Sequence, residues 1–326
     1  MRDKKTQKNA ALKPVRRKRS RWSQDDTELT LLALPTTIWY ALFSYLPMFG
    51  LILAFKDFKI SAGKSFITSL LQSDWVGFKN FEFFVKSNQF SVILRNTILY
   101  NVVFIILGII LPVACAIMID QIYSKRASKT YQTMMFLPHF MSWVVISYFV
   151  YAFLSPSQGL LNVILKSLGQ DPIKWYQESK YWPFILTFMN TWKTLGYSMV
   201  VYLASITGID TSLYEAAVLD GASKTQQARY ITLPSLRPMI ILMFIMNVGR
   251  IFSSDFGLFY QIPRGVTNSL WKVTETFDVY IYNMLQTNIP IGRTAAASFF
   301  QSIAGCITIL IANGIVRKID SDSALI

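Results

Sequence analysis

This chain of 326 residues has few charged side chains, one histidine and two cysteines. Charged residues make up 15% of the sequence, whereas ordinary soluble proteins have about 25%. Cys115 and Cys306 lie in separate apolar segments, and His139 has no neighbouring carboxylate or thiol cluster, so neither a disulfide framework nor a metal site is predicted. We interpret the cysteines as apolar packing residues and His139 as a hydrogen-bonded structural residue. Because no group of nucleophile, base and metal ligand occurs, we predict that the chain is not an enzyme.

Apolar residues instead fill 52% of the chain, and its mean hydropathy is +0.36. They gather in long segments, each sufficient for the ~20 residues that cross a ~30 Å hydrocarbon core. We therefore predict an all-α membrane protein with six transmembrane helices, at residues 29–55, 92–119, 131–154, 182–206, 239–260 and 291–316. The predicted organisation is a basic tail at 1–28, a membrane domain at 29–318 and a short tail at 319–326.

The net charge of +14 is concentrated at the N-terminus, where a basic cluster precedes the first span: Arg16, Arg17, Lys18, Arg19 and Arg21. The positive-inside rule then places both termini in the cytoplasm, because an even number of spans returns the chain to the same side. No folded basic domain or RNA motif accompanies the cluster, so we expect contact with anionic lipid and no nucleic-acid partner. No cleavable signal peptide is predicted.

The loop at 208–235 has a polar pattern of fixed spacing between two apolar segments. Asp210 and the residues after it suit a helix start, where acids and hydroxyls cap free amide groups. Ala216 and Ala217 would give this helix a low profile, Gly221 permits a sharp reversal, and Pro234 is expected to end a second helix. These features predict a helix-turn-helix knob in the cytoplasm, with an ordinary amphipathic linker as the alternative.

The run EAAVLDGASKTQQARYITLP within this loop resembles the EAA loop of permease subunits from binding-protein-dependent ABC importers. That resemblance implies the type I importer permease architecture, in which the loop is a coupling helix that docks on a cytoplasmic ATPase. The residues carried over are Glu215, Ala216, Ala217, Asp220, Gly221, Leu233 and Pro234. It also implies a bacterial inner-membrane location and these partners: a second homologous permease, two ABC ATPases and an extracytoplasmic solute-binding protein.

ATP and Mg²⁺ would be bound by those ATPases, and no cofactor is expected in this chain. The segment 61–65 contains the Gly-Lys-Ser end of a phosphate-binding loop, but Phe58 occupies the position of its first glycine. We therefore do not expect this segment, in a predicted external loop, to bind ATP.

Further similarity covers most of the chain and points to sugar permeases that import oligosaccharides from complex polysaccharides. It is carried by segments 75–81, 246–252, 255–260 and 300–302, although segment 276–282 departs from the expected pattern. The resemblance implies oligosaccharide transport by alternating access, with uronate-containing chains among the usual substrates.

Cations inside or beside the predicted spans are the second indication of function: Arg95, Lys193, Arg250 and Arg293. A charge at the bilayer centre costs ~2.5–3.5 kcal/mol on insertion scales, so such residues normally face a partner or a wet cavity. Asp255 is placed to neutralise Arg250, and the other cations favour an anionic sugar. The alternative is that Arg95 and Arg293 reach the interface while Lys193 pairs with the partner permease.

We thus predict an ATP-driven permease for acidic oligosaccharides, with a substrate path that includes Arg95, Trp192, Lys193, Tyr197, Arg250, Asp255 and Tyr260. Trp192 is the preferred candidate because it offers a stacking face beside the charge of Lys193. The alternatives are an ABC permease for neutral oligosaccharides and an ion-coupled secondary transporter.

Overall fold

A computed structural model describes residues 23–59, 63, 65–265, 269–287 and 289–319. The described chain is helical and contains no strand, only one antiparallel bridge between Lys56 and Trp75. The chain forms two compact units, Met1–Leu51 and Ile52–Ile326. The predicted basic cluster and most of the C-terminal tail lie outside the described residues, as does most of the segment 61–65.

The N-terminal unit contains α1 (Gln24–Tyr40), which begins at Ser23 with a reciprocal capping box to Asp26. The helix continues through a π-helical turn, η1 (Ala41–Tyr45), into the 3₁₀ segment η2 (Leu46–Phe55). No residue of α1 is buried, and its leucines face the surroundings. This 32-residue helical segment, Gln24–Phe55, is long and apolar enough to cross a membrane.

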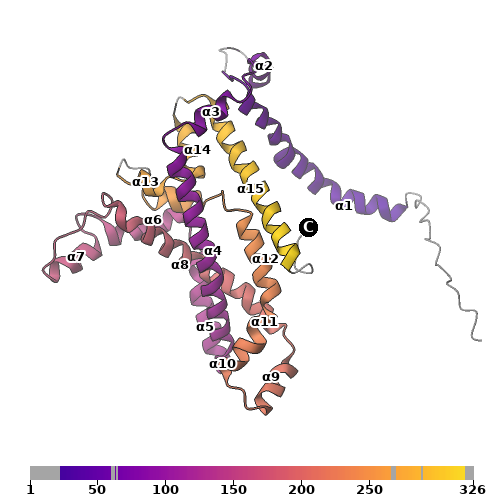
Figure 1. Cartoon of the computed structure of the whole chain (residues 1–326), viewed down its shortest axis with the longest axis vertical. Coiled ribbons are helices and arrows are strands. Elements are labelled where there is room, and N and C mark those ends of the chain that lie inside the picture. The colour runs from indigo at the N-terminus through magenta and orange to yellow at the C-terminus, as the bar shows by residue number, and fades with distance from the viewer. Residues whose placement is uncertain (1–22, 60–62, 64, 266–268, 288, 320–326) are drawn as a thin grey trace, which may run out of the picture. The chain divides into compact units, whose positions relative to one another are not determined.

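The second unit contains the remaining helices (Figure 1). Its N-terminal part has α2 (Phe66–Gln72), α3 (Lys79–Val85), α4 (Phe90–Asp120), α5 (Lys125–Phe136), η3 (Leu137–Phe140), α6 (Trp143–Leu154), α7 (Leu160–Ser167) and η4 (Ser179–Tyr181). Its C-terminal part has α8 (Trp182–Thr207), α9 (Thr211–Leu219), α10 (Lys224–Gln227), η5 (Ala228–Thr232), α11 (Leu233–Ser235), α12 (Arg237–Val248), η6 (Gly257–Gln261), α13 (Trp271–Thr274), α14 (Phe277–Gln286) and α15 (Ile291–Ile319).

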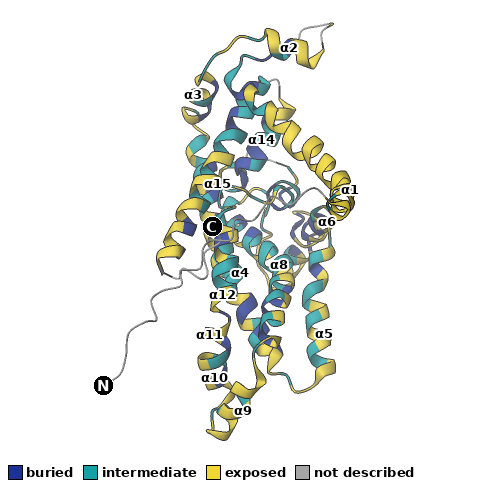
Figure 2. Cartoon of the chain, turned by 90° about the vertical axis from the view of Figure 1, so that its right-hand side faces the viewer, coloured by how far each residue is buried: buried dark blue, intermediate teal, exposed yellow. Residues whose placement is uncertain are grey.

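The packing of α4 along α8 is the main contact of this unit. Near the α9 end, Ala116 and Ile119 of α4 lie against Tyr202 of α8 in one buried cluster. A second cluster joins α6, α8 and η6, and a third joins α3, α14 and α15. Figure 2 shows these buried residues along the helix bundle, while α9 is exposed.

Three helices in the described residues are long and apolar enough to span a membrane: Gln24–Phe55, α4 and α15. Two bent pairs raise the number to five if each pair is one span, α5–η3 with α6 and α10–α11 with α12. The α8 helix has 26 residues but carries Asn190 and Lys193, which lower its apolarity. The predicted number of six spans therefore stays a prediction.

Two predicted spans are not single helices. The third, 131–154, bends by 99° between Phe140 and Trp143, next to Pro138 in η3. The fifth, 239–260, stops being helical after Val248 and resumes at η6. Proline and side chains that bond to the backbone explain these interruptions, because both replace regular helical hydrogen bonds.

The predicted end of the second helical piece at Pro234 agrees to within one residue, because the helical segment Lys224–Ser235 ends at Ser235. A π-helical turn over Ala228–Thr232 precedes Pro234, which then lies in the first turn of a new α-helical segment. Proline is tolerated there because its missing N–H has no intrahelical partner to lose. The chain bends by 56° only after Ser235, where α12 begins.

Glu275 lies between α13 and α14 and is buried, with 5% of its surface exposed. Burial raises the pKa of this carboxyl, and a hydrogen bond from Asn283 opposes the rise. The neutral form of Glu275 therefore stabilises the folded protein fully at pH values below the usual glutamate pKa. This stabilisation is lost as the pH rises through the raised pKa of the folded state. Glu275→Gln should raise the melting temperature at neutral pH by ~2–4 °C and have little effect in acid. Melting curves of the detergent-solubilised protein over ~pH 4 to 8 measure the difference.

The matched control is Glu178→Gln, since Glu178 is exposed and forms only a surface ion pair with Lys180. Its melting temperature should follow that of the parent at every pH. An equal response of both variants would contradict the assignment of the effect to Glu275.

Candidate coupling and substrate sites

The predicted coupling knob begins at Asp210, as the sequence indicated. The Asp210 carboxylate accepts a hydrogen bond from the Ser212 backbone N–H at 2.9 Å and caps α9. This hydrogen bond lowers the pKa of Asp210, so the carboxylate remains charged at the positive end of the helix.

Gly221 ends α9 in the left-handed conformation that the sequence pattern predicted, with φ of +78°. The N–H of Ala222 donates to the carbonyl of Ala217 at 2.8 Å, and the N–H of Gly221 donates to that of Val218 at 3.0 Å. This pair of bonds is the Schellman arrangement, in which Asp220 is the C-cap. A second helix then begins at Ser223 with a capping box to Gln226.

The surface of α9 is apolar and unpartnered within the described chain. No residue of α9 is buried, and Leu219 has 89% of its surface exposed, with Leu213 and Val218 also at least half exposed. Glu215 and Ala216 are exposed on the same short helix. Exposed apolar residues rimmed by polar ones are typical of a protein-docking surface.

The knob is connected to the helix bundle through its base. Tyr214 of α9 and Thr232 of η5 share a hydroxyl hydrogen bond at 2.8 Å, and Leu233 and Pro234 follow on the exposed surface of α11. A cavity of about 650 Å³ separates α9 from the ends of α4 and α8. Beyond the Tyr214–Thr232 hydrogen bond, η5 contacts α11, and α11 contacts α12, so a continuous series of packed segments leads from the base of the knob to α12.

The helix is interrupted after α12, and this break, residues 249–256, contains two predicted path residues, Arg250 and Asp255. Its backbone groups are bonded by side chains of three other helices. Asn101 of α4 donates to the carbonyls of Ile251 and Ser253, both at 3.0 Å. Gln301 of α15 donates to the Phe252 carbonyl at 3.0 Å, and Asp278 of α14 accepts from the Ser254 N–H at 2.6 Å. Irregular backbone at membrane depth is stable only where such partners or a wet cavity satisfy it.

Lys193 lies at the bend between η3 and α6. Its ammonium donates to the carbonyls of His139, at 2.9 Å, and Met141, at 2.5 Å. The hydrogen-bonded role predicted for the His139 side chain is not observed, because the residue accepts only through its backbone carbonyl and the buried Nδ1 of its ring has no hydrogen-bond partner among the described residues. Tyr197, one turn after Lys193, stacks on the His139 ring with centroids 4.7 Å apart.

Trp143 connects Lys193 to Asp255. The Lys193 ammonium lies 5.3 Å from the centre of the Trp143 ring, and the indole N–H donates to the Asp255 carboxylate at 2.7 Å. Asp255 forms no ion pair with Arg250 in the described chain, so this predicted pairing is not observed. The structure therefore brings together Lys193, Tyr197 and Asp255 around the bend.

The other predicted path residues lie elsewhere. Arg95 donates to the Lys272 carbonyl at 2.8 Å, at the junction of α4 with α13. Arg250 is exposed in the break. Tyr260 stacks on Phe256 at 4.9 Å and contacts Tyr282 edge-on.

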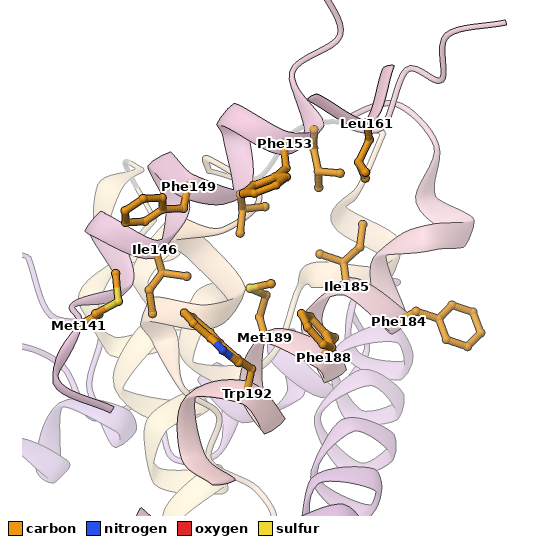
Figure 3. A pocket seen from close by; sticks show the side chains of 12 residues that line it. Met141, Ile146, Phe149, Phe153, Leu161, Phe184, Ile185, Phe188, Met189 and Trp192 are labelled. Carbon is orange, nitrogen blue, oxygen red and sulfur yellow. The ribbon is translucent and has the colours of Figure 1, made fainter. Parts of the chain in front are cut away.

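Trp192 lines an apolar cavity of about 670 Å³ between α6 and α8, together with Phe149, Phe153 and Phe188 (Figure 3). Lys193 does not line this cavity, because its ammonium donates to the carbonyls of His139 and Met141 at the bend. The ring of Trp192 and the charge of Lys193 therefore do not form the single site that was predicted. Carbohydrates need polar partners, and this cavity offers almost none.

Sequence reasoning missed Trp143, Asn101, Asp278 and Gln301. The interior positions of Asn101 and Gln301 could have been predicted, since polar amides inside otherwise apolar spans normally face the protein interior. Trp143 and Asp278 had none, because their contacts join residues 112 and 24 positions apart.

Comparison with known proteins agrees with this architecture. Residues 105–322 match the family described as the binding-protein-dependent transport system inner membrane component. The chain belongs to this family. It is a non-catalytic ABC transporter permease, as the EAA loop indicated, and the ion-coupled alternative is not supported.

Among its relatives, the polygalacturonan/rhamnogalacturonan transport system permease protein YteP of Bacillus subtilis (strain 168) is 29% identical, over 89% of this chain and 88% of that protein. A crystal structure of a bacterial ABC transporter involved in the import of the acidic polysaccharide alginate contains a chain 31% identical to this one. The match has a TM-score of 0.81 and covers 91% of this chain and 97% of that one. The alginate transporter has also been solved in complex with its alginate pentasaccharide-bound periplasmic protein, with a TM-score of 0.80 to this chain, 31% identity, and coverage of 90% and 96%.

Proposed function

We propose that this permease carries acidic, uronate-containing oligosaccharides across the bacterial cytoplasmic membrane, with both termini in the cytoplasm. The observation that carries the proposal is the 31% identity over 91% of the chain to a permease of an alginate importer. The pectin-fragment permease YteP supports the same chemistry. The exposed cation Arg250 in the break at 249–256 also suits an anionic cargo.

The proposed machine contains a second permease, two ABC ATPases that bind ATP and Mg²⁺, and an extracytoplasmic solute-binding protein. The exposed apolar surface of α9 supports ATPase docking, and the connection through η5 and α11 supports transmission of ATPase closure to α12. Because α12 leads directly into the break at 249–256, that motion would reach Arg250 and Asp255. The side chains of Asn101, Asp278 and Gln301 would then guide the break between outward and inward states.

Arg250 is the best placed of the predicted cations to test the charge of the cargo. It is exposed in the break, whereas Lys193 and Arg95 already donate to backbone carbonyls. Arg250→Gln should lower uptake of an acidic oligosaccharide about tenfold, because one charge-assisted bond is worth ~1.5–3 kcal/mol, and should leave neutral sugars nearly unchanged. Uptake by the complete importer in proteoliposomes, with alginate, galacturonan and maltose pentasaccharides, provides the measurement.

Lys193→Gln is the comparison variant. Since its ammonium bonds the bend, we expect it to lower uptake of every transported sugar through loss of structure. Best transport of maltopentaose by the parent importer would replace the proposed cargo with neutral oligosaccharides.

A further inference from the structure

Arg264 has an unusual backbone conformation for a residue with a side chain. Its φ is +61°, the one positive value outside glycine among the described residues. The turn around it is fixed by two backbone bonds, from Arg264 N–H to the Gln261 carbonyl and from Gly265 N–H to the Tyr260 carbonyl. Residues in this region of the backbone are rare, and where they persist they often belong to functional sites.

The conformation places the Arg264 guanidinium on a tyrosine surface of α6. Its central carbon lies 4.1 Å from the ring centre of Tyr151 and 5.8 Å from that of Tyr148. These two tyrosines are three positions apart, so they lie on one side of the helix. Both rings are partly open to the surroundings, with 36% and 64% of their surface exposed.

A third ring, that of Tyr176, packs between Tyr151 and the buried core. Tyr176 lies 5.8 Å from Tyr151 and 5.2 Å from the fully buried Trp182. Burial raises the pKa of Tyr176 to about 12, while the positive charge of Arg264 opposes the rise. The tyrosine surface is therefore anchored to the core of the second unit.

The hydrogen-bonding edge of Arg264 is unused. Throughout the described residues, no carboxylate pairs with this guanidinium and no acceptor takes a hydrogen bond from it. The central carbon of the guanidinium lies over the Tyr151 ring, and a guanidinium that stacks on a ring with its flat face keeps its in-plane N–H groups available. Those groups match a carboxylate in a bidentate arrangement, and an exposed ring beside them suits the flat face of a sugar.

The segments that build this cluster come from one predicted side of the membrane. Tyr148 and Tyr151 lie in the second half of the third predicted span, while Tyr176 and Arg264 follow the third and fifth spans. The predicted topology places all of them at or near the external face. A sugar released by the binding protein would meet this face first.

We propose that Arg264, Tyr148 and Tyr151 form an outer subsite that binds one uronate residue of the cargo before it enters the membrane. This proposal rests on the proposed function. The guanidinium binds the carboxylate, Tyr148 stacks against the sugar ring, and Tyr151 holds the guanidinium in place.

The test measures uptake by the complete importer in proteoliposomes, with alginate, galacturonan and maltose pentasaccharides as probes. Arg264→Asn removes the guanidinium but keeps a residue that tolerates positive φ, so backbone strain is not the cause of a loss. We expect its KM for the transported acidic pentasaccharide to rise about tenfold, while the KM for maltopentaose changes less than about twofold. Arg264→Lys should recover part of the loss, because it keeps the charge without the planar fork.

One control separates this subsite from general electrostatics, and a second variant tests the ring that holds the guanidinium. Lys166→Asn removes an exposed cation of α7 from the same predicted side and should not change the KM. Tyr151→Leu removes the ring under Arg264 and should resemble Arg264→Asn.

Equal losses for acidic and neutral sugars in Arg264→Asn would overturn the subsite and indicate a docking contact for the binding protein. An effect seen only in proteoliposomes that contain anionic lipid would overturn it in favour of a lipid headgroup. In both cases the parent still imports oligosaccharides and the proposed function stands. A parent importer that transports no acidic sugar would overturn the subsite and the acidic cargo together.

Discussion

Replacement of Gly221 by valine is expected to abolish ATP-driven uptake while leaving the protein inserted in the membrane. Gly221 adopts φ of +78° at the end of α9, where a β-branched side chain is strongly disfavoured. A left-handed residue with a side chain costs ~1–2 kcal/mol, and valine costs more. The chain would leave the Schellman turn to relieve this strain and would carry Glu215, Ala216 and Ala217 out of register with the ATPase. Uptake and sugar-stimulated ATPase activity of the reconstituted importer should both fall at least ~10-fold.

Gly221→Asn is the matched control, because asparagine tolerates the left-handed conformation. Nothing lies within 4 Å of a Cβ added at this position, so steric contact inside the chain does not explain a loss. The asparagine variant should retain most of the activity. If valine and asparagine variants are equally active, the turn is not needed for coupling.

Replacement of Gly196 by alanine is expected to destabilise the membrane domain itself. Gly196 is buried in α8, and a Cβ there would lie 2.0 Å from the Met135 carbonyl oxygen and 2.6 Å from the Cα of Phe136. Both obstacles are backbone atoms, so rotation of a side chain cannot relieve the contact. Separation of α8 from α5 would also draw Lys193 away from the bend. Overpacking of this kind costs ~1–3 kcal/mol or more, and the yield and melting temperature of the purified protein should both fall.

Gly108→Ala provides the same chemical change without the contact. Gly108 lies inside α4, and nothing lies within 4 Å of a Cβ at that position. Because alanine is the better helix former by up to ~1 kcal/mol, this variant should be as stable as the parent or more stable. Equal melting temperatures for the two alanine variants would show that α5 and α8 are not in close contact in the membrane.

The coupling knob was predictable because its signals are local. The cap at Asp210 and the turn at Gly221 depend on residues within a few positions of each other, and both are confirmed. The hydrogen-bond pattern around Pro234 shows the limit of local reasoning. The π-helical turn at Ala228–Thr232 changes the hydrogen-bond register before Pro234, and no residue type in that turn predicts the change.

The break at 249–256 and the bend at Lys193 were less predictable, because the residues that bond them come from distant parts of the sequence. Hydropathy treated 239–260 as one span, whereas Asn101 and Gln301 bond the backbone inside it from 152 and 49 positions away. Lys193 was expected to meet a substrate or a partner permease, yet its hydrogen bonds go to carbonyls of its own chain. Charge in an apolar span indicates that a partner exists, and the tertiary structure decides whether the partner is a carboxylate or the backbone.

The Lys193 contact also has a consequence for biosynthesis. The carbonyls of His139 and Met141 precede Lys193 by 54 and 52 residues. At ~5–20 residues per second, the ribosome finishes the bend several seconds before it produces the lysine that bonds it. During that interval the two carbonyls depend on water or on the translocation machinery for hydrogen bonds. The bend between η3 and α6 therefore gains its hydrogen bonds from Lys193 only after α8 has been synthesised. We expect α8 to be the helix that stabilises this bend during folding of the nascent chain.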